Sequence, residues 1–272
     1  MTEVRFLILL PDDPAEVLAA TPLIRCLKQQ VSDSWVHPVV QENHAWIFEN
    51  NPWASESYIW KSKPDERIEE VKEQQPDYMI DLEGKRLYRR LKRKTKVLDF
   101  CIGRVSRSIA STPRDRMFRT VHLFDVTDDQ KNTEWFPPAF ESEWLPGKFS
   151  TGFIFLSLEG CETSKGFGED ELVHWISLIE KPLVLAGPAA LRPMADRIVQ
   201  RTGCTVFPIC GDFNPAQQSS IMSASAGVAG FNAFWPDAAE CLGKPVVRLG
   251  SEGAKDPVEL ARQVRQWLEP KP

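Results

Sequence analysis

Short apolar segments alternate with helical segments along this chain of 272 residues, and that alternation constrains its fold more than any other feature. In the first half, the apolar pattern predicts strands at residues 4–10, 35–40, 57–60 and 78–82 and helices at 15–30, 43–49 and 66–74. The segment 4–10 is almost continuously apolar, which is typical of a parallel strand that is covered on both faces. The alternation therefore predicts a parallel sheet with helices packed on it.

The pattern begins again at residue 152. Strands are predicted at residues 152–158, 183–186, 205–208, 226–229 and 246–249, and helices at 169–180, 189–202, 215–224, 235–242 and 256–268. The stretch 98–148 is rich in proline and charge, so it is expected to hold loops and a linker. We therefore predict an α/β protein with two Rossmann-like domains, residues 1–148 and 149–272. The helix at 256–268 is expected to pack back on the first domain.

Composition argues against nucleic-acid binding, a metal site and a membrane span. Hydrophobic residues make up 42% and charged residues 26% of the chain, as in a globular protein, and the net charge of −5 does not favour nucleic-acid binding. None of the six cysteines forms a C-x-x-C pair and the four histidines fit no metal spacing, so no metal site is expected. The apolar run 6–10 is too short for a signal peptide or a membrane span, which favours the cytoplasm.

Two segments carry motifs. Residues 11–25 read P-D-D-P-A-E-V-L-A-A-T-P-L-I-R and follow the first strand. Residues 230–247 read G-F-N-A-F-W-P-D-A-A-E-C-L-G-K-P-V-V, a loop and short helix that lead into the last strand. In nucleotide-binding α/β domains, such a loop and the helix N-terminus after it hold phosphate.

Both segments resemble those of glycosyltransferase family 9, the bacterial heptosyltransferases. That family reads S-S-L-G-D-V-x-x-x-T-P-x-I-R in the first segment and G-N-D-S-G-P-x-H-x-A-A-A-x-G-x-P-V-V in the second. Residues 81–84, D-L-E-G, resemble its D-L-x-G element. The resemblance is strongest in residues 4–84 and 150–250. It implies the GT-B architecture, with two parallel sheets facing a cleft, the acceptor bound by the first domain and the donor by the second.

The resemblance also implies an activity. Family members transfer a heptose or related sugar from an ADP-sugar to a lipopolysaccharide-type or other glycan acceptor, with inversion at the anomeric carbon and without a metal. On this interpretation no cofactor is needed beyond the nucleotide-sugar substrate. The expected partners are a nucleotide sugar and a glycolipid or glycan acceptor.

On the acceptor side, the family's catalytic Asp falls on Glu16, which makes Glu16 the candidate general base, with Asp13 as the fallback. The alternative is that Glu16 is a helix-start carboxylate stabilised by the helix dipole. Asp81 and Gly84 are expected at the end of a strand, and the resemblance implies that this strand end faces the acceptor. The alternative is that Asp81 is an ordinary residue between strand and loop and that Gly84 only makes the turn.

A dense basic run covers residues 85–96 and includes Lys85, Arg86 and Arg89. Such a run suits acidic sugars or phosphates of a lipopolysaccharide core, and also peripheral contact with the inner membrane. The alternative is a solvated helix face.

On the donor side, Lys165 matches a family lysine that contacts phosphate. The other candidate donor-binding residues, carried over from the resemblance, are Gly187, Gly211, Asn232, Ala233 and Asp237.

Several positions depart from the family motif. Asn232 stands for its Asp, Phe234 and Trp235 for its Gly and Pro, and Asp237 for its His. Bulk and negative charge at the helix start are expected to weaken the binding of an ADP-sugar. The alternative function is therefore a catalytically inactive family member that acts as a binding or scaffolding protein. An unrelated two-domain α/β enzyme is the third hypothesis.

Overall fold

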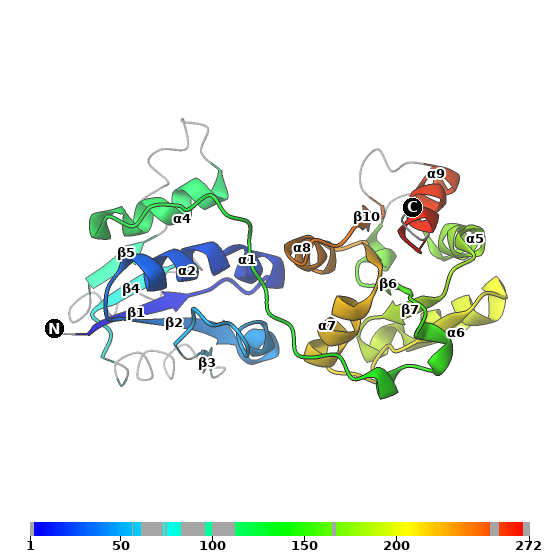
Figure 1. Cartoon of the computed structure of the whole chain (residues 1–272), viewed down its shortest axis with the longest axis horizontal. Coiled ribbons are helices and arrows are strands. Elements are labelled where there is room, and N and C mark those ends of the chain that lie inside the picture. The colour runs from blue at the N-terminus through cyan, green and yellow to red at the C-terminus, as the bar shows by residue number, and fades with distance from the viewer. Residues whose placement is uncertain are drawn as a thin grey trace. The chain divides into compact units, whose positions relative to one another are not determined.

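The structure, a computed structural model, describes residues 3–55, 57–60, 73, 75–82, 96–99, 112–164, 167–250 and 256–268. It divides into two compact units, Met1–Phe136 and Pro137–Pro272 (Figure 1). The sequence analysis placed the domain boundary after residue 148. In the structure the intervening stretch packs with the second unit, where the ring of Trp144 lies 5.8 Å from that of Phe213.

The first unit is built on a parallel five-stranded sheet with the order β3-β2-β1-β4-β5. Its strands are β1 (Val4–Leu9), β2 (Ser34–Gln41), β3 (Tyr58–Trp60), β4 (Tyr78–Asp81) and β5 (Lys96–Asp99). Its described helices are α1 (Pro14–Ala19), α2 (Thr21–Gln30), α4 (Pro113–Val121) and the 3₁₀ turns η1 (Glu42–Ile47) and η4 (His122–Phe124). The central strand β1 is buried from Phe6 to Leu9, as its apolar sequence predicts.

The single helix predicted at 15–30 is two helices in the structure. Pro22 has no backbone N–H to continue the first helix, and a proline fits the first turn of a new one. The Thr21 hydroxyl donates to the carbonyl oxygen of Leu18 at 3.0 Å, which satisfies an acceptor at the end of α1. The break therefore follows from the Thr-Pro pair itself.

The prediction that residues 98–148 hold only loops is wrong, because α4 lies within them. The start of α4 is a capping box, in which the Thr112 hydroxyl accepts from the N–H of Asp115 at 3.1 Å and the Asp115 carboxylate accepts from the N–H of Thr112 at 2.8 Å. Pro113 occupies its first turn. Residues 112–115, T-P-R-D, carry this helix-start signal in the sequence.

The second unit has a parallel sheet with the order β10-β9-β6-β7-β8. Its strands are β6 (Ile154–Ser157), β7 (Leu183–Ala186), β8 (Val206–Pro208), β9 (Gly227–Gly230) and β10 (Val246–Arg248). Its helices are α5 (Glu169–Ile179), α6 (Arg192–Thr202), α7 (Pro215–Ala224), α8 (Phe234–Cys241) and α9 (Pro257–Arg265). Short 3₁₀ turns are η5 (Ser142–Trp144), η6 (Gly147–Phe149), η7 (Cys161–Thr163), η8 (Ala189–Leu191) and η9 (Gln266–Leu268).

Helices cover both faces of this second sheet. Figure 1 shows α5, α6 and α9 on one side of the sheet and α7 and α8 on the other. Within the second unit α9 packs against α5. The Arg265 guanidinium donates to the carbonyl oxygen of Leu178 at 2.6 Å and fixes this contact. The expected packing of this helix on the first domain concerns both units and stays a prediction.

Both sheets have the same topology. Numbered from the first strand of each unit, the strand order is 3-2-1-4-5, which is the doubly wound Rossmann order. The prediction of two Rossmann-like α/β halves is thereby confirmed. The expected cleft, which concerns both halves together, stays a prediction.

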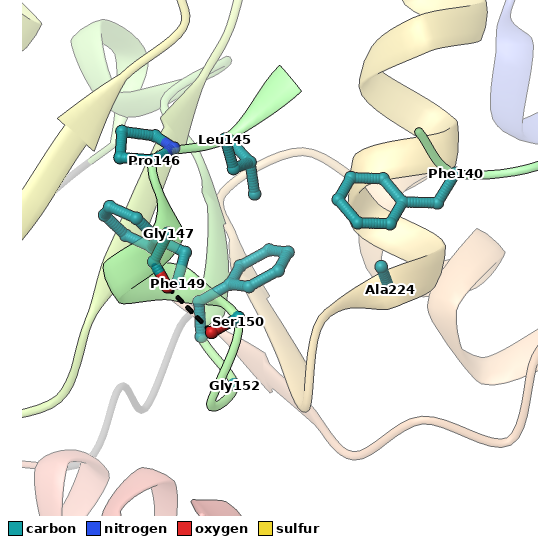
Figure 2. A pocket seen from close by; sticks show the side chains of 9 residues that line it. Phe140, Leu145, Pro146, Gly147, Phe149, Ser150, Gly152 and Ala224 are labelled. Atoms are coloured by element: carbon teal, nitrogen blue, oxygen red, sulfur yellow. Dashed lines mark hydrogen bonds between the residues drawn. The ribbon is translucent and has the colours of Figure 1, made fainter. Parts of the chain in front are cut away.

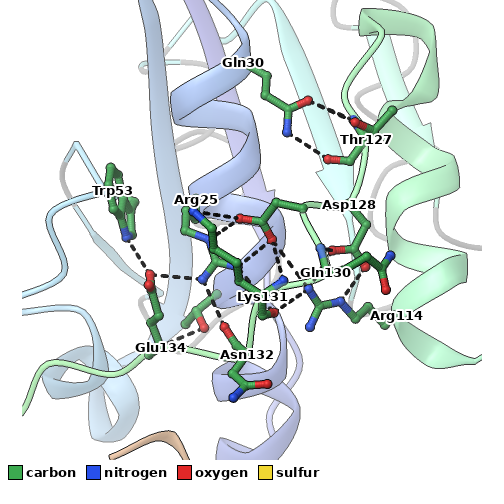
Figure 3. Close-up of polar contacts among 12 residues, drawn as sticks. Arg25, Gln30, Trp53, Arg114, Thr127, Asp128, Gln130, Lys131, Asn132 and Glu134 are labelled. Atoms are coloured by element: carbon green, nitrogen blue, oxygen red, sulfur yellow. Dashed lines mark hydrogen bonds and ion pairs between the residues drawn. The ribbon is translucent and has the colours of Figure 1, made fainter.

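One buried cation organises the first unit. Arg25 on α2 is only 1% exposed, and its guanidinium donates to both carboxylate oxygens of Asp129, at 2.8 and 2.9 Å (Figure 3). It also pairs with the Glu134 carboxylate at 3.0 Å. Burial alone would lower the pKa of Arg25, but the hydrogen bonds to Asp129 and Glu134 raise it, so the side chain stays charged.

Further hydrogen bonds fasten the same segment to α2. The Gln30 amide donates to the Thr127 carbonyl oxygen and accepts from its N–H, at 2.8 and 2.9 Å, and the Thr21 hydroxyl donates to the Glu134 carbonyl oxygen at 3.0 Å (Figure 3). The Trp53 indole N–H donates to the Glu134 carboxylate at 2.9 Å. Residues 127–134, the segment that ends the first unit, are thus held along the whole of α2.

Replacing Arg25 with Met should lower the free energy of unfolding by about 3 kcal/mol, because the change leaves Asp129 and Glu134 without their buried partner. Chemical denaturation followed by tryptophan fluorescence measures the loss. Arg262→Met is the matched control, since Arg262 pairs with Glu259 on an exposed helix face and should change stability by about 0.5 kcal/mol or less. Equal effects of the two changes would contradict the role of Arg25.

The same ion pair predicts an acid transition. The hydrogen bonds from Arg25 lower the pKa of the Asp129 carboxyl to about 2. A depressed pKa in the folded state stabilises the fold above the carboxyl's ordinary pKa of about 4, and this contribution is lost as pH falls toward 2. Asp129→Asn should remove that part of the pH dependence between pH about 4 and 2. Denaturation midpoints across this range, compared with those of the exposed-site variant Asp170→Asn, check it.

Candidate functional site

Ligands of doubly wound sheets bind outside the carboxyl ends of the strands, at the point where the strand order reverses. In the first unit this switch point lies between β1 and β4, and in the second unit it lies between β6 and β9. Five of the predicted site residues lie in the loops and helix starts that follow β1 and β9, namely Asp13, Glu16, Asn232, Ala233 and Asp237, and Asp81 ends β4.

At the edge of the first sheet, Asp13 and Glu16 take different roles. Asp13 caps α1, because its carboxylate accepts from the N–H groups of Ala15 and Glu16 at 2.8 and 3.2 Å. Glu16 lies in the first turn of α1 and its side chain is exposed. The structure therefore gives Asp13, the fallback base, a structural task and leaves Glu16 accessible from solvent.

Two buried polar side chains lie near them. Asp81 ends β4, beside Leu9 of β1, and is fully buried. His44 on η1 follows β2, and its buried Nδ1 has no hydrogen-bond partner among the described residues. Burial lowers the pKa of His44, and the nearby carboxylates of Asp12 and Asp13 only partly oppose that, so the imidazole is neutral at pH 7. His44 was not among the predicted site residues, since nothing in its neighbourhood along the chain indicates this edge.

At the edge of the second sheet, Asn232 faces a carboxylate that the sequence analysis did not single out. The amide Nδ2 of Asn232, after β9, donates to the carboxylate of Glu159, after β6, at 2.7 Å. Burial raises the pKa of Glu159 above its ordinary value, and hydrogen bonds from Trp235 and Asn232 only partly oppose the rise. A carboxyl with this environment at a switch point is a candidate functional group.

The start of α8 is filled by aromatic rings. Ala233, at the N-cap position, is exposed and makes no side-chain capping hydrogen bond. Phe234 is 4% exposed and lies against Trp235 with ring centroids 5.2 Å apart, and Trp235 lies at the same distance from Phe155 of β6. The two bulky residues that depart from the family motif are therefore part of the core of the second unit.

Asp237 forms an ion pair. Its carboxylate lies 2.7 Å from the guanidinium of Arg248 on β10, which also contacts Glu240 at 2.9 Å. The negative charge that the sequence analysis expected to repel a diphosphate is thus compensated within the protein.

Two of the predicted glycines have a backbone role. The carbonyl oxygen of Gly187, after β7, accepts from the N–H of Gly211 at 3.2 Å and from the Gln218 amide at 3.3 Å. Gly211 has φ +77°, and a Cβ there would lie 2.7 Å from the Cβ and 2.8 Å from the Cα of Ala189. Gly211 is therefore required by the turn and by the close approach of the η8 backbone.

Five predicted site residues lie outside the described residues. They are Lys165 on the donor side and Gly84, Lys85, Arg86 and Arg89 on the acceptor side. Their expected roles stay predictions.

The cysteines are free thiols wherever the structure describes them. Burial raises the pKa of Cys161 to about 11 and that of Cys210 and Cys241 to about 12, so these thiols stay protonated at neutral pH. Within the described ranges, no group of three His, Cys, Asp or Glu side chains is arranged to hold a metal ion. No described helix is both long and apolar enough to span a membrane.

A pocket of about 130 Å³ lies in the second unit, away from the strand ends (Figure 2). It is lined mainly by apolar side chains, including Phe140, Leu145, Phe149 and Phe153, the last of which directly precedes β6. It therefore lies at the amino ends of the strands, opposite the carboxyl ends that carry the candidate site, and it contains none of the predicted site residues.

Many solved structures are similar to this chain. Glycosyl transferase family 9 from Veillonella parvula matches with a TM-score of 0.73 and 15% identity, over 92% of this chain and 82% of that one. The ADP-heptose lipopolysaccharide heptosyltransferase II of E. coli matches with a TM-score of 0.69 and 12% identity, over 94% and 88%. The E. coli heptosyltransferase WaaC with ADP-2-deoxy-2-fluoro heptose matches with a TM-score of 0.70 and 15% identity, over 97% and 99%.

This chain has the fold of glycosyltransferase family 9. The predicted resemblance to that family is confirmed at the level of the fold, with the divergence that the sequence departures indicate. No protein-family model matches the sequence, and no curated protein matches it.

The close approach at Gly211 predicts a large stability loss on substitution. Gly211→Ala adds a Cβ to a left-handed residue and drives it into the backbone of Ala189, which should lower the free energy of unfolding by about 3 kcal/mol. Gly203→Ala is the matched control, because Gly203 has φ +62° but no atom within 4 Å of an added Cβ, so only about 1 kcal/mol is expected. Denaturant titration of both variants measures the difference, and equal losses would rule out the clash.

Proposed function

We propose that this protein is a glycosyltransferase that moves a sugar from a nucleotide sugar, ADP-linked as in heptosyltransferases, to a lipopolysaccharide-type or other glycan acceptor. The observation that carries the proposal is the likeness to heptosyltransferase structures over more than nine-tenths of the chain. Two of those proteins are named for ADP-heptose or hold an ADP-linked heptose analogue. A matching fold does not by itself give an activity, so the site residues are what the experiments must test.

In the proposed reaction, the first unit binds the acceptor and Glu16 is the general base. Its carboxylate takes the proton of the acceptor hydroxyl as the oxygen attacks the anomeric carbon, and the nucleoside diphosphate leaves with the bonding electrons. Attack from the side opposite the leaving group inverts the configuration. Exposure of Glu16 at the carboxyl edge of the sheet supports this role, and Asp81 is proposed to orient the acceptor.

The second unit is proposed to bind the donor. Lys165 and the N-terminus of α8 would stabilise the leaving diphosphate, so that no metal is needed. The loops that carry Gly187 and Gly211 would approach the nucleotide through their backbone. The basic run at 85–96 is proposed to contact the acidic part of a glycolipid acceptor and the inner-membrane surface.

Glu16→Gln should lower the rate of sugar transfer by about 100-fold or more, which is the usual contribution of a general base. Transfer from an ADP-hexose or ADP-heptose to a lipopolysaccharide-core acceptor, followed by release of ADP, measures the rate. Glu42→Gln is the matched control, because Glu42 is an exposed carboxylate at the same sheet edge. If Glu16→Gln transferred sugar at the natural rate, Glu16 would not be the base.

A catalytically inactive binding or scaffolding protein is the second candidate. The burial of Phe234 and Trp235 at the start of α8 favours it, because their rings occupy the place where the family motif has Gly and Pro. A diphosphate needs close access to the backbone N–H groups of that helix start. The two candidates differ in how well the chain binds a nucleotide.

We expect ADP to bind with a Kd in the millimolar range, which corresponds to a favourable binding free energy of about 4 kcal/mol. The reason is that the bulky start of α8 keeps the diphosphate away from the helix N-terminus. Titration calorimetry with ADP, and thermal shift with a panel of nucleotides and nucleotide sugars, measure it. Micromolar binding would show that the site tolerates the aromatic rings and would favour an active transferase.

A further inference from the structure

The Glu159–Asn232 hydrogen bond joins the two loops that flank the switch point of the second sheet. β6 and β9 are adjacent parallel strands, with Ser157 of β6 beside Gly230 of β9. Glu159 follows the first strand and Asn232 the second, and their side chains meet at 2.7 Å. The pair therefore lies at the position where a doubly wound sheet binds its ligand.

The two loops approach each other closely. Gly160, directly after Glu159, has φ +87°, and an added Cβ would lie 3.3 Å from the Cβ of Phe231 and 3.4 Å from the backbone N of Asn232. The backbone N–H of Glu159 also donates to the Ser157 hydroxyl at 3.3 Å. The positions of the carboxylate and the amide are thus set by the strands and not by a free loop.

The described residues do not fill the hydrogen-bond acceptor capacity of the pair. An ionised carboxylate can accept about four hydrogen bonds, and in the described part of the chain Glu159 accepts from the side chains of Asn232 and Trp235. The Asn232 amide directs its Nδ2 to Glu159, and its Oδ1 is buried with no hydrogen-bond partner in the described part of the chain. A ligand group that fits here must bring hydrogen-bond donors.

Hydroxyl groups fit that requirement and phosphate does not. A phosphate oxygen is a negatively charged acceptor, so it brings no donor for the Asn232 Oδ1 and is repelled by the ionised form of Glu159. Among the described residues, no cation contributes to the pKa of Glu159. Adjacent hydroxyls on a sugar ring each carry a donor, and a carboxylate–amide pair can accept from both.

We propose that Glu159 and Asn232 form a recognition site for two neighbouring hydroxyl groups of a sugar ring and determine specificity for a hydroxylated ligand. The identification of that ring as part of a nucleotide sugar rests on the proposed function. Two rings share this chemistry, the sugar to be transferred and the ribose of the nucleotide. The carboxylate that the family motif has in the loop after β9 is supplied here by Glu159, from the loop after β6.

Saturation-transfer NMR on the full chain tests the proposal without requiring turnover. The probes are free mannose, free glucose, ADP, 2′,3′-dideoxyadenosine diphosphate, an ADP-hexose and inorganic pyrophosphate. Ring protons beside the bound hydroxyls should receive saturation in the natural protein. If free hexoses give a signal, the ring that the pair recognises is the transferred sugar. If ADP gives ribose signals and the dideoxy analogue does not, the ring is the ribose of the nucleotide.

The variants separate recognition from folding. Glu159→Gln should weaken binding of the responding sugar by about 10-fold or more, since it replaces a charged acceptor by a neutral one. Asn232→Ala should weaken it as well. Glu159→Gln combined with Asn232→Asp returns a carboxylate to the pair and should recover most of the affinity. Glu162→Gln, an exposed carboxylate in the same loop, is the matched control and should bind as the natural protein does. Thermal melts establish that each variant is folded.

The outcomes distinguish this proposal from the proposed function. Sugar binding that depends on Glu159, together with no transfer activity, would keep the recognition site and remove the transferase. Nucleotide-sugar binding or transfer that is unchanged in Glu159→Gln would overturn the recognition site and keep the transferase. Pyrophosphate binding that becomes tighter in Glu159→Gln would show that the pair faces a phosphate, and it would overturn the proposal. If no sugar or nucleotide gives a signal with the natural protein, both are overturned.

Discussion

The buried guanidinium of Arg25 is the interaction on which the first unit depends. A charge removed from water is unfavourable unless oppositely charged and hydrogen-bonding groups surround it. Here those groups come from residues 127–134, more than a hundred positions along the chain, and they are held against α2. Thr21 and Arg25 belong to the segment that most resembles the family motif. In this structure they act as scaffold, which explains why that motif predicts the fold better than the chemistry.

The sequence predicted most of the strands because they are compact apolar runs that must be buried, but it missed β5, in which only Val97 and Leu98 are apolar. It failed between residues 98 and 148 because proline and charge there were interpreted as signs of a loop. Two of those charges, Asp129 and Glu134, are the partners of Arg25, and a contact over that separation leaves no local pattern. The start of α4 was different, since Thr112, Pro113 and Asp115 form a local capping signal that the sequence does contain.

Some residues of the candidate site could likewise be predicted from the sequence and others could not. Glu16 and Asn232 could be found from the sequence because they occupy positions of a recognisable motif. Glu159 and His44 could not, because a Glu after a strand and a His in a short turn are most often solvated or structural. What distinguishes Glu159 is a hydrogen bond to a residue 73 positions away, across the switch point of the sheet. Only the topology, which places the loops after β6 and β9 together, makes it a candidate.

The residues that depart from the family motif at this edge interact with other residues of the second unit. Asp237 is matched by Arg248, Asn232 by Glu159, and the rings of Phe234 and Trp235 by Phe155. A site that had merely decayed would be expected to leave unpaired charges and cavities, each of which destabilises a fold. The substitutions instead make one packed arrangement around the start of α8. Reverting a single residue would remove a partner from another, so the binding properties of this edge belong to the group of residues and must be tested on the group.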